Sequence, residues 1–374
     1  MRLRRCWRKP RCLIIEHRSV PIYLNGKFRT QRITGVQRVA TELVHALDVL
    51  QPAGHWVLLC PAGTPRLPLT HIEQRCVGPS GLPPYLWEQT VLPWAARGGW
   101  LVSLAGGAPA LARRDFAVLH DAAVFDHPEA YAWSFVTWYR WLFRHLADRG
   151  TRLLTVSSFS RRRLALRLGL AEDRLAVLPL GADHLGAVPP DLTVLDRLSL
   201  RRRPFILAVG SANPTKNLDF LARACVDLGP GAPVLVVVGG RHDRIFATGA
   251  LPLGVVHAGP VADAELVALY RHALCLIFPS VYEGFGLPPL EAMACGCPVA
   301  AARAAAVPEA CGDAALYFNP TDQEDLQRAI SRLLTDGPLR DELRRAGRTQ
   351  AAKWNWTAAA EQLRLHLHMA GAPC

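Results

Sequence analysis

The chain has 374 residues, of which half are hydrophobic, and this length exceeds what a single core usually organises. No apolar run approaches the roughly 18 uninterrupted residues of a membrane span, and the start, MRLRRCWRKPRC, lacks the apolar segment of a secretory signal. We therefore expect two domains and a cytoplasmic location. Because the ten cysteines are scattered, we expect reduced thiols and no metal site.

The formal net charge of +12 favours anionic partners such as nucleic acid or a membrane surface. Only four of the 43 basic residues are lysine, so a compositional bias toward arginine explains part of the excess. The tail 1–19 and the cluster of residues 161–163 with Arg167 favour peripheral contact with an anionic inner membrane, where each surface cation adds about 1 kcal/mol. A solvated tail and a solvated helix face are the alternatives.

Apolar runs alternate with helical patterns along the chain, which is typical of parallel α/β architecture. In the first half a helix is expected after Thr34 and Gly35, because Val39, Leu43 and Leu47 recur every four residues. The strands expected in this half are 21–24, 56–59, 100–104, 116–119 and 153–156.

The second half repeats this alternation, with strands expected at 205–210, 234–238, 255–256, 273–278 and 299–300. Between the halves, residues 186–203 contain two adjacent prolines and three adjacent arginines and are the candidate linker, although 192–200 can form a short helix. The predicted organisation is a basic tail, an N-terminal domain, a linker, a C-terminal domain and a final helix, at 1–19, 20–185, 186–203, 204–353 and 354–374.

Residues 279–298, PSVYEGFGLPPLEAMACGCP, form the most informative segment of the sequence. An apolar run ends there, a glycine-rich turn follows, and Pro288 and Pro289 open a segment with helical spacing of apolar residues. Gly296 is the residue type that ends a helix in a left-handed turn. The segment therefore predicts a strand, a glycine loop and a short helix whose N-terminus faces the loop.

A helix N-terminus presents unpaired N–H groups and partial positive charge, so the backbone before this helix is suited to a phosphate or diphosphate. Glu283 and Glu291 suit the same site if the ligand also carries hydroxyl groups, as a nucleotide sugar does, because carboxylates accept strong hydrogen bonds. Glu283 on the loop would face the sugar and Glu291 the ribose. For either residue alone the alternative is structural: Glu283 would be a solvated loop residue, and Glu291 would complement the helix dipole in the first turn.

A second motif, residues 209–217, follows the first strand of the second half and precedes a helix. Its centre is Lys216, one of only four lysines, whose ammonium is a compact partner for diphosphate oxygens. A lysine near a helix start is unfavourable unless an anion is present. The motif thus predicts a second part of the diphosphate site.

Residues 131–143, YAWSFVTWYRWLF, are dense in aromatic side chains and lead into Arg144 and Arg149. Such a stretch can rest in a membrane interface with its rings at the headgroup level. An aromatic stripe at helical spacing is more often part of a core, which is the interpretation that we favour here.

Residues 283–299 resemble the ExxxxxxxE segment of glycosyltransferase family 4, whose members are retaining enzymes with the two-domain GT-B fold. The resemblance continues through Pro308 and Glu309 to Asn319 and Pro320, and resumes at Trp-Asn-Trp, residues 354–356. It extends loosely over about residues 20–365 and is strongest to the bacterial mannosyltransferase-like branch.

The resemblance implies the fold class: α/β, GT-B, with two Rossmann-like domains whose parallel sheets face an interdomain cleft. The C-terminal domain would bind the donor and the N-terminal domain the acceptor. The last helix would cross back onto the first domain.

The resemblance also implies donor-side roles. In the family the first glutamate lies near the donor sugar, the second binds the ribose, and a lysine and the intervening amides bind the diphosphate. Many relatives carry an arginine where this chain has Ser211, so either the Ser211 hydroxyl or a nearby arginine would replace it. The donor-binding residues implied are Gly35, Ser211, Lys216, Glu283, Gly284, Phe285, Gly286, Leu287 and Glu291.

In the first half, residues 34–38 resemble the family's N-terminal glycine loop, which closes over the donor phosphates and helps to shape the acceptor pocket. An ordinary loop glycine is the alternative for Gly35. His120 matches the family's histidine near the reacting sugar and would bind or position it, with a satisfied core histidine as the alternative. The acceptor-side residues implied are Val36, Gln37, Arg38, His120 and Asp121, and the candidate catalytic residues are His120, Lys216 and Glu283.

We therefore expect a retaining glycosyltransferase that moves a hexose, with mannose favoured, from a nucleotide diphosphate sugar to a glycan or lipid-linked oligosaccharide in bacterial polysaccharide assembly. GDP-mannose is the suspected donor. No DxD motif follows a strand of the second half, so we expect no metal, and we expect no cofactor. The family is retaining and the sequence identifies no carboxylate nucleophile for the opposite face, so same-face attack assisted by the diphosphate is the mechanism that we favour. No nucleic-acid partner is expected.

Three alternatives remain. A nucleotide-sugar epimerase of similar architecture would act on the donor without an acceptor. A dinucleotide oxidoreductase is disfavoured, since no GxGxxG opens either half with an acidic residue roughly 20 positions later. A nucleic-acid-binding protein would rest on the net charge alone.

Overall fold

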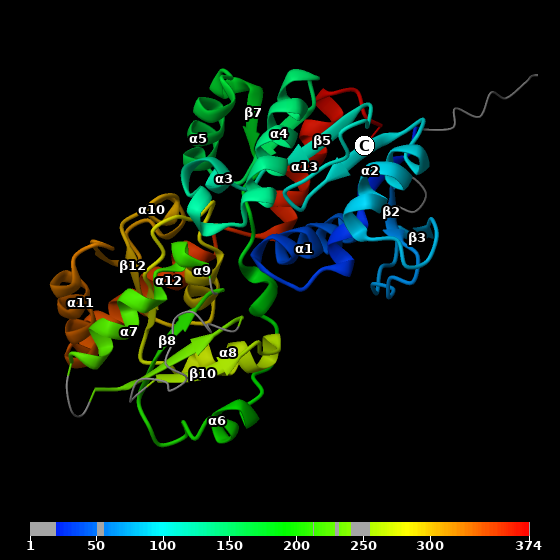
Figure 1. The fold of residues 1–374 in the computed structure, drawn as a ribbon. Helices are drawn as coiled ribbons and strands as arrows, with labels where there is room; N and C mark the ends of the chain where they lie inside the picture. Colours follow the sequence, from blue (N-terminus) through cyan, green and yellow to red (C-terminus); the bar gives the residue numbers. More distant parts are fainter. Residues whose placement is uncertain (1–19, 51–55, 212, 229–231, 241–254, 374) are drawn as a thin grey trace, which may run out of the picture.

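The computed structural model describes residues 20–50, 56–211, 213–228, 232–240 and 255–373, and it contains two parallel β-sheets flanked by helices (Figure 1). The basic tail 1–19 lies outside the described residues. Every strand pairing within the described residues is parallel, as the alternating pattern predicts.

The first sheet has the order β3-β2-β1-β4-β5-β6-β7. Its strands are β1 (Ile22–Asn25), β2 (Trp56–Pro61), β3 (Glu73–Val77), β4 (Trp100–Ser103), β5 (Asp115–Val118), β6 (Arg152–Thr155) and β7 (Leu175–Val177). The helices of this half are α1 (Gly35–Leu50), α2 (Pro84–Ala95), α3 (Ala123–Asp126), α4 (Trp133–Asp148) and α5 (Ser158–Leu168). The sequence did not predict β3 and β7, which are the two edge strands.

The second sheet has the order β10-β9-β8-β11-β12-β13. Its strands are β8 (Phe205–Val209), β9 (Val234–Val238), β10 (Val255–Gly259), β11 (Leu276–Phe278), β12 (Val299–Ala302) and β13 (Leu316–Phe318). The helices that follow are α7 (Leu218–Val226), α8 (Asp263–His272), α9 (Leu287–Ala294), α10 (Val307–Cys311), α11 (Gln323–Thr335), α12 (Gly337–Ala351) and α13 (Trp356–Met369). The edge strand β13 was not predicted either.

Strand order reverses once in each sheet, because β1 lies between β2 and β4, and β8 lies between β9 and β11. Ligands of open parallel sheets bind beyond the carboxyl ends of the strands at such a switch point. The carboxyl ends of β8 and β11 lead into residues 210–217 and 279–286, which are the two predicted donor motifs. The topology therefore brings these motifs together.

The predicted linker 186–203 is not an extended connection, because part of it is helical and packed. It contains α6 (Thr193–Arg197), whose Val194 and Leu195 are buried, and α6 packs against α8. The Asp191 amide donates to the carbonyl of Ala264 at 2.9 Å, and Arg197 pairs with Glu265. The segment is therefore packed onto the C-terminal domain, because its apolar residues have a surface to cover.

The last helix, α13, packs against α1 of the first half, far from α12 that precedes it in the chain (Figure 1). Leu363 and Leu367 of α13 share one apolar core with Val39 and Leu43 of α1. This core continues into the second half, so apolar contact joins the two domains. No helix among the described residues is long and apolar enough to cross a membrane, and the cysteines within the described residues are free thiols.

Candidate active site between the two sheets

The loop after β11 leads directly into α9, as the strand–loop–helix prediction requires. Gly286 has φ +110°, a conformation that strongly favours glycine, and Gly296 ends the helix at φ +77°. The helix begins at Leu287, so Pro288 and Pro289 occupy its first turn without N–H groups. Free amides at this end are therefore confined to residues 284–287, which donate no hydrogen bond to other described residues.

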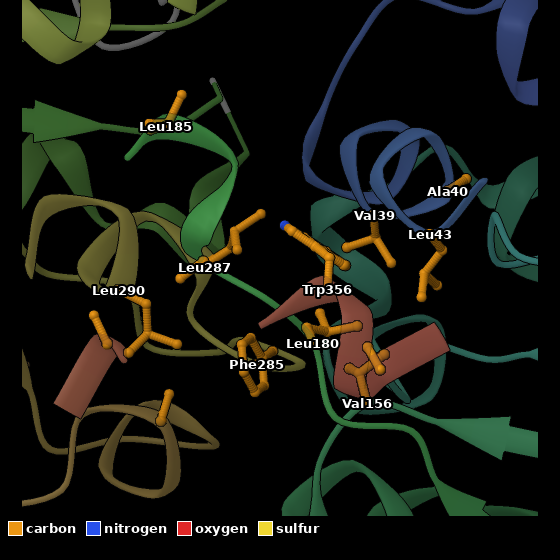
Figure 2. Close-up of a cluster of buried hydrophobic side chains, with 14 of the residues drawn as sticks. Val39, Ala40, Leu43, Val156, Leu180, Leu185, Phe285, Leu287, Leu290 and Trp356 are labelled. Carbon is orange, nitrogen blue, oxygen red and sulfur yellow. The ribbon is translucent and has the colours of Figure 1, made fainter. Parts of the chain in front are cut away.

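The side chains of Phe285 and Leu287 point into the apolar core that joins the domains (Figure 2). The Phe285 ring meets the Trp354 ring edge-on with centroids 5.0 Å apart. Only the backbone of these two residues is therefore available to a ligand. Their buried rings and branches fix the loop from which the amides project.

The backbone at Gly284 is docked onto the N-terminal domain. Its carbonyl accepts hydrogen bonds from Ser157 Oγ at 2.6 Å and Ser160 Oγ at 3.0 Å. A Cβ placed on Gly284 would lie 2.5 Å from the carbonyl oxygen of His120 and 3.2 Å from Asp121 Cβ. Only glycine allows this approach, which places His120 and Asp121 directly against the donor loop.

Lys216 and Glu283, predicted for the diphosphate and the sugar, are ion-paired with each other, Nζ to Oε1 at 2.7 Å. Their side chains are 24% and 12% exposed, so the pair is reachable from solvent. Burial raises the pKa of Asp121, and the nearby Lys216 ammonium opposes this rise while Glu283 adds to it. The three charged groups thus lie together at the domain boundary, and a diphosphate would compete with Glu283 for the ammonium.

Glu291 is buried at the same boundary and receives two hydrogen bonds. His184 Nε2 lies 3.1 Å from Oε1, and the Tyr270 hydroxyl donates to Oε2 at 3.1 Å. Arg38 of α1 lies close enough for Glu291 to contribute to the raised pKa of its guanidinium. The carboxylate is therefore held in one orientation between the two domains.

His120 is buried, and its Nε2 lies 2.8 Å from the carbonyl oxygen of Leu104. A carbonyl only accepts, so Nε2 carries the proton and Nδ1 is left as an acceptor. Burial lowers the pKa of His120 to about 4, and hence the imidazole is neutral at pH 7. With this geometry, Nδ1 can accept a hydrogen bond from a sugar hydroxyl, as the predicted positioning role requires.

The buried neutral state of His120 predicts a pH dependence of stability. Between the ordinary histidine pKa of about 6.5 and the folded value of about 4, the unfolded chain binds the proton and the folded chain does not. Stability therefore falls as pH falls through this window, by up to about 1.4 kcal/mol per pH unit from this residue. Denaturant unfolding of wild type and His120→Gln should show the wild type losing more stability from pH 6.5 to 4. Equal losses would contradict the assignment.

Gly35, predicted for the donor, and the predicted acceptor-side residues 36–38 form the first turn of α1. The Gln37 carboxamide accepts from the Thr34 amide at 3.2 Å, which caps the helix. Arg38 bridges the domains, with Nη1 2.8 Å from Asp263 Oδ2 at the start of α8. Gly35 and Val36 belong to the same turn, and a Cβ on Gly35 would meet nothing within 4 Å. Gln37 therefore caps the helix and Arg38 joins the two domains, while the space beside Gly35 is open.

Ser211 is exposed at the carboxyl end of β8 and makes no hydrogen bond to the described part of the chain. Residue 212 lies outside the described residues. The nearby Gly210 packs against the aliphatic stem of Lys216, with 3.5 Å from a Cβ at this glycine to Lys216 Cβ. The structure therefore orders the lysine and leaves the hydroxyl of Ser211 free for a ligand.

Sequence reasoning missed a buried polar cluster at the switch point of the first sheet. Lys27 Nζ pairs with Glu88 Oε2 at 2.5 Å and lies 4.5 Å from the centroid of the Tyr85 ring. Asn25 donates to Glu88 Oε1 at 2.7 Å and to Ser103 Oγ at 3.2 Å. The scarcity of lysine, which singled out Lys216, applies equally to Lys27 and is the signal that would have found it.

Further contacts across the boundary also escaped prediction. Glu309 of α10 accepts from the amides of Ser158 at 2.7 Å and Phe159 at 3.1 Å, so one domain caps a helix of the other. Tyr282 donates to Asp126 Oδ2 at 2.9 Å. Burial alone would raise the pKa of Asp126, but hydrogen bonds from arginines and Tyr282 lower it to about 2.

The arginines that bind Asp126 belong to the basic cluster predicted for a membrane. Arg163 and Arg167 both bond Asp126 at 2.7 Å, and Arg161 lies 3.4 Å from Glu172. Three of its four arginines are therefore paired with a carboxylate inside the protein, whereas Arg162 is exposed and forms no ion pair with a described residue. Arg163 and Arg167 hold the Asp126 carboxylate, which accepts a hydrogen bond from Tyr282 across the domain boundary.

Comparison with known proteins agrees with this geometry. The family model described as "Glycosyl transferases group 1" matches residues 197–350, which contain both donor motifs. The chain is 30% identical over 261 residues to the O-antigen chain mannosyltransferase B of Escherichia coli, covering 67% of this chain and 68% of that protein. The chain belongs to the group 1 glycosyltransferases.

Solved structures share the fold of this glycosyltransferase. Sucrose-phosphate synthase from Thermosynechococcus elongatus superposes with a TM-score of 0.73 at 20% identity, over 95% of this chain and all of that chain. Anabaena HepE, solved in complex with UDP-glucose, superposes with a TM-score of 0.70 at 18% identity, over 93% and 99%. The predicted two-domain GT-B architecture is confirmed.

Proposed function

We propose that this glycosyltransferase transfers a hexose, mannose, from a nucleotide diphosphate sugar to a glycan or lipid-linked oligosaccharide in bacterial polysaccharide assembly. The Escherichia coli relative is an O-antigen chain mannosyltransferase, which supports mannose and an O-antigen acceptor. The UDP-glucose complex of the structural neighbour supports a nucleotide sugar donor. GDP-mannose is the donor that we propose.

One observation carries this proposal. The loops after β8 and β11 place Lys216, Glu283 and the free amides of residues 284–287 side by side, with His120 against them from the other sheet. A cation and a run of amides suit a diphosphate, and the carboxylates and imidazole suit hydroxyl groups. A nucleotide sugar carries both a diphosphate and hydroxyl groups, so it can bind both groups of residues at once.

Transfer requires that the acceptor oxygen bond to the anomeric carbon while the bond from that carbon to the diphosphate oxygen breaks. Lys216 and the amides stabilise the charge that develops on the departing diphosphate. In the mechanism we propose, the acceptor attacks the face that the diphosphate leaves, and the acceptor proton passes to the departing phosphate oxygen. His120 Nδ1 accepts a donor-sugar hydroxyl and holds the ring in place. This route retains the anomeric configuration and uses no metal or other cofactor.

The test begins with calorimetric titration of UDP, GDP, ADP and their sugars. GDP and GDP-mannose should bind most tightly, and purified enzyme with donor and a lipid-linked oligosaccharide should form an α-mannoside in the presence of EDTA. Conversion of the donor alone to an isomer would instead identify an epimerase. Salt-sensitive binding of duplex DNA without any sugar transfer would overturn the enzyme assignment.

We propose in addition that an exposed aromatic surface rests on an anionic membrane. The described residues expose four tryptophans on α2 and α4, so the core interpretation favoured for residues 131–143 is wrong for Trp133, Trp138 and Trp141. The loop 104–114 links these helices, since Ala110 bonds both His145 and Gln89. We define the aromatic surface as Tyr85, Leu86, Trp94, Leu111, Trp133, Phe135, Trp138 and Trp141.

The charge beside the aromatic surface supports this partner. Arg97, Arg113 and Arg114 are exposed and form no ion pair with a described residue. Arg149, in contrast, pairs with the buried Asp115 and is not available. Interfacial tryptophans with nearby cations suit anionic headgroups.

We expect the double variant Trp138→Ser/Trp141→Ser to bind vesicles containing phosphatidylglycerol roughly tenfold more weakly than wild type, because two interfacial rings are lost. Vesicle sedimentation measures this. The control, Leu365→Ser/Met369→Ser, removes exposed apolar side chains from α13 and should bind normally. Equal binding of wild type and the tryptophan variant, or equal binding to neutral phosphatidylcholine vesicles, would contradict the proposed contact.

A further inference from the structure

A chain of hydrogen bonds ends on Glu291 and begins on the far side of the domain boundary. The Trp356 indole donates from Nε1 to His184 Nδ1 at 3.2 Å, and His184 Nε2 lies 3.1 Å from Glu291 Oε1. Tyr270 completes the set at Glu291 Oε2. The members come from α13, the segment Asp183–Leu185, α9 and α8, so no single element explains the arrangement.

The direction of these bonds follows from their chemistry. An indole N–H can only donate, so His184 Nδ1 must present its lone pair to Trp356. The remaining ring proton of His184 then sits on Nε2, and it is donated to the Glu291 carboxylate. Trp356 thus selects the tautomer in which His184 is a donor toward Glu291.

The second oxygen of Glu291 has an equally fixed partner. Tyr270 is fully buried, and burial raises the pKa of its hydroxyl well above the usual value, so the hydroxyl remains a donor. Each carboxylate oxygen therefore receives one donor and retains one acceptor position. The side chain of Glu291 is 8% exposed, so only a small part of its surface remains open.

Trp356 itself is held closely against the end of the first domain. Its amide donates to Asp183 Oδ1 at 3.0 Å, and a Cβ on Gly181 would lie 2.4 Å from its amide nitrogen. Figure 2 shows the indole between Val39 of α1 and Leu287 at the start of α9. The orientation of Glu291 therefore depends on how α13 sits against the first domain.

We propose that Trp356 and His184 are positioning residues that hold Glu291 in the orientation that accepts the ribose hydroxyls of the donor. The inference rests on the proposed function, in which Glu291 binds the ribose. Holding a flexible glutamate in its binding rotamer lowers the entropy lost when the nucleotide binds. Helix α13, which carries Trp356, thereby contributes to donor affinity without contacting the donor.

The experiment compares the tightest-binding of GDP, UDP and ADP with its 2′,3′-dideoxy form by calorimetry. A hydrogen bond to a charged group contributes about 1.5–3 kcal/mol, so wild type should prefer the ribose form by roughly 10- to 100-fold. His184→Leu and Trp356→Phe should lose most of this preference while their affinity for the dideoxy form is unchanged. His184→Gln should keep it, because its amide nitrogen can replace Nε2.

Trp354→Phe is the matched control. Its indole nitrogen is buried without a hydrogen-bond partner, so the same exchange of indole for phenyl should leave the preference intact. Unchanged dideoxy affinity in each variant shows that the site is folded, which separates orientation of Glu291 from general damage. Equal weakening of both nucleotides would indicate a merely structural role and overturn the inference.

Glu291→Ala separates this inference from the proposed function. If that variant keeps the ribose preference, then Glu291 does not bind the ribose and the proposed function fails at this residue. If it loses the preference while His184→Leu and Trp356→Phe retain it, only the positioning inference fails. In wild type, ¹⁵N NMR of the His184 ring should show a neutral tautomer protonated at Nε2, and a proton on Nδ1 would also contradict the inference.

Discussion

Replacing Lys216 by alanine should reduce the rate of sugar transfer by about 10²- to 10³-fold, the usual effect of removing one group that stabilises a developing anion. Lys216 Nζ lies 2.7 Å from Glu283 and is the only cation paired there within the described residues. Its loss would also leave Glu283 to repel the diphosphate. Steady-state kinetics with saturating donor measures the effect on kcat.

Lys353→Ala provides a matched control for this prediction, since Lys353 is exposed and bonds only Gln350 at 2.8 Å among the described residues. It should transfer sugar at the wild-type rate. Lys216→Arg should be more active than Lys216→Ala because it keeps the positive charge. It should be less active than wild type because a planar guanidinium replaces the compact ammonium. Wild-type turnover by Lys216→Ala would remove Lys216 from the mechanism.

Gly284→Ala should reduce transfer by about 10²-fold, because a misplacement of roughly 1 Å between reacting groups has an effect of this size. The new Cβ would lie 2.5 Å from the His120 carbonyl, and neither backbone can yield without separating the domains. Two serine hydroxyls that bond the Gly284 carbonyl would be displaced as well. Activity and small-angle scattering together should report lower turnover and a more open molecule.

Nucleotide affinity should change much less in Gly284→Ala, since the proposed donor contacts lie mainly in the C-terminal domain. Gly337→Ala is the control, because a Cβ there would have its nearest neighbour at 3.8 Å. It should behave as wild type in both measurements. Full activity of Gly284→Ala would show that the close approach of loop and first sheet is not needed for transfer.

The sequence predicted the central strands of both sheets and missed the edges for a physical reason. Central parallel strands are covered on both faces and therefore read as apolar runs, such as β9 with its five buried residues. Strand β3, in contrast, is a sheet edge with the polar sequence EQRCV, and most of it is exposed. Strands β7 and β13 are edges of three residues each, too short to show a period.

The site was predictable where one continuous segment carries it. The glycine loop, the start of α9, and Lys216 after β8 follow from local pattern, and the structure places them together. The partners from other elements do not follow, because no local pattern says which surfaces meet. His184 is a single histidine in a connecting segment, and its role becomes evident only from its hydrogen bonds with Glu291 and Trp356.

The most direct test of the central claim is a crystal structure of the enzyme with bound GDP-mannose. The account predicts diphosphate oxygens within hydrogen-bonding distance of Lys216 Nζ and the amides of residues 284–287. It also predicts ribose hydroxyls on Glu291 and a sugar hydroxyl on His120 Nδ1. A nucleotide bound elsewhere, or one whose ribose faces away from Glu291 while Lys216 stays paired with Glu283, would contradict it.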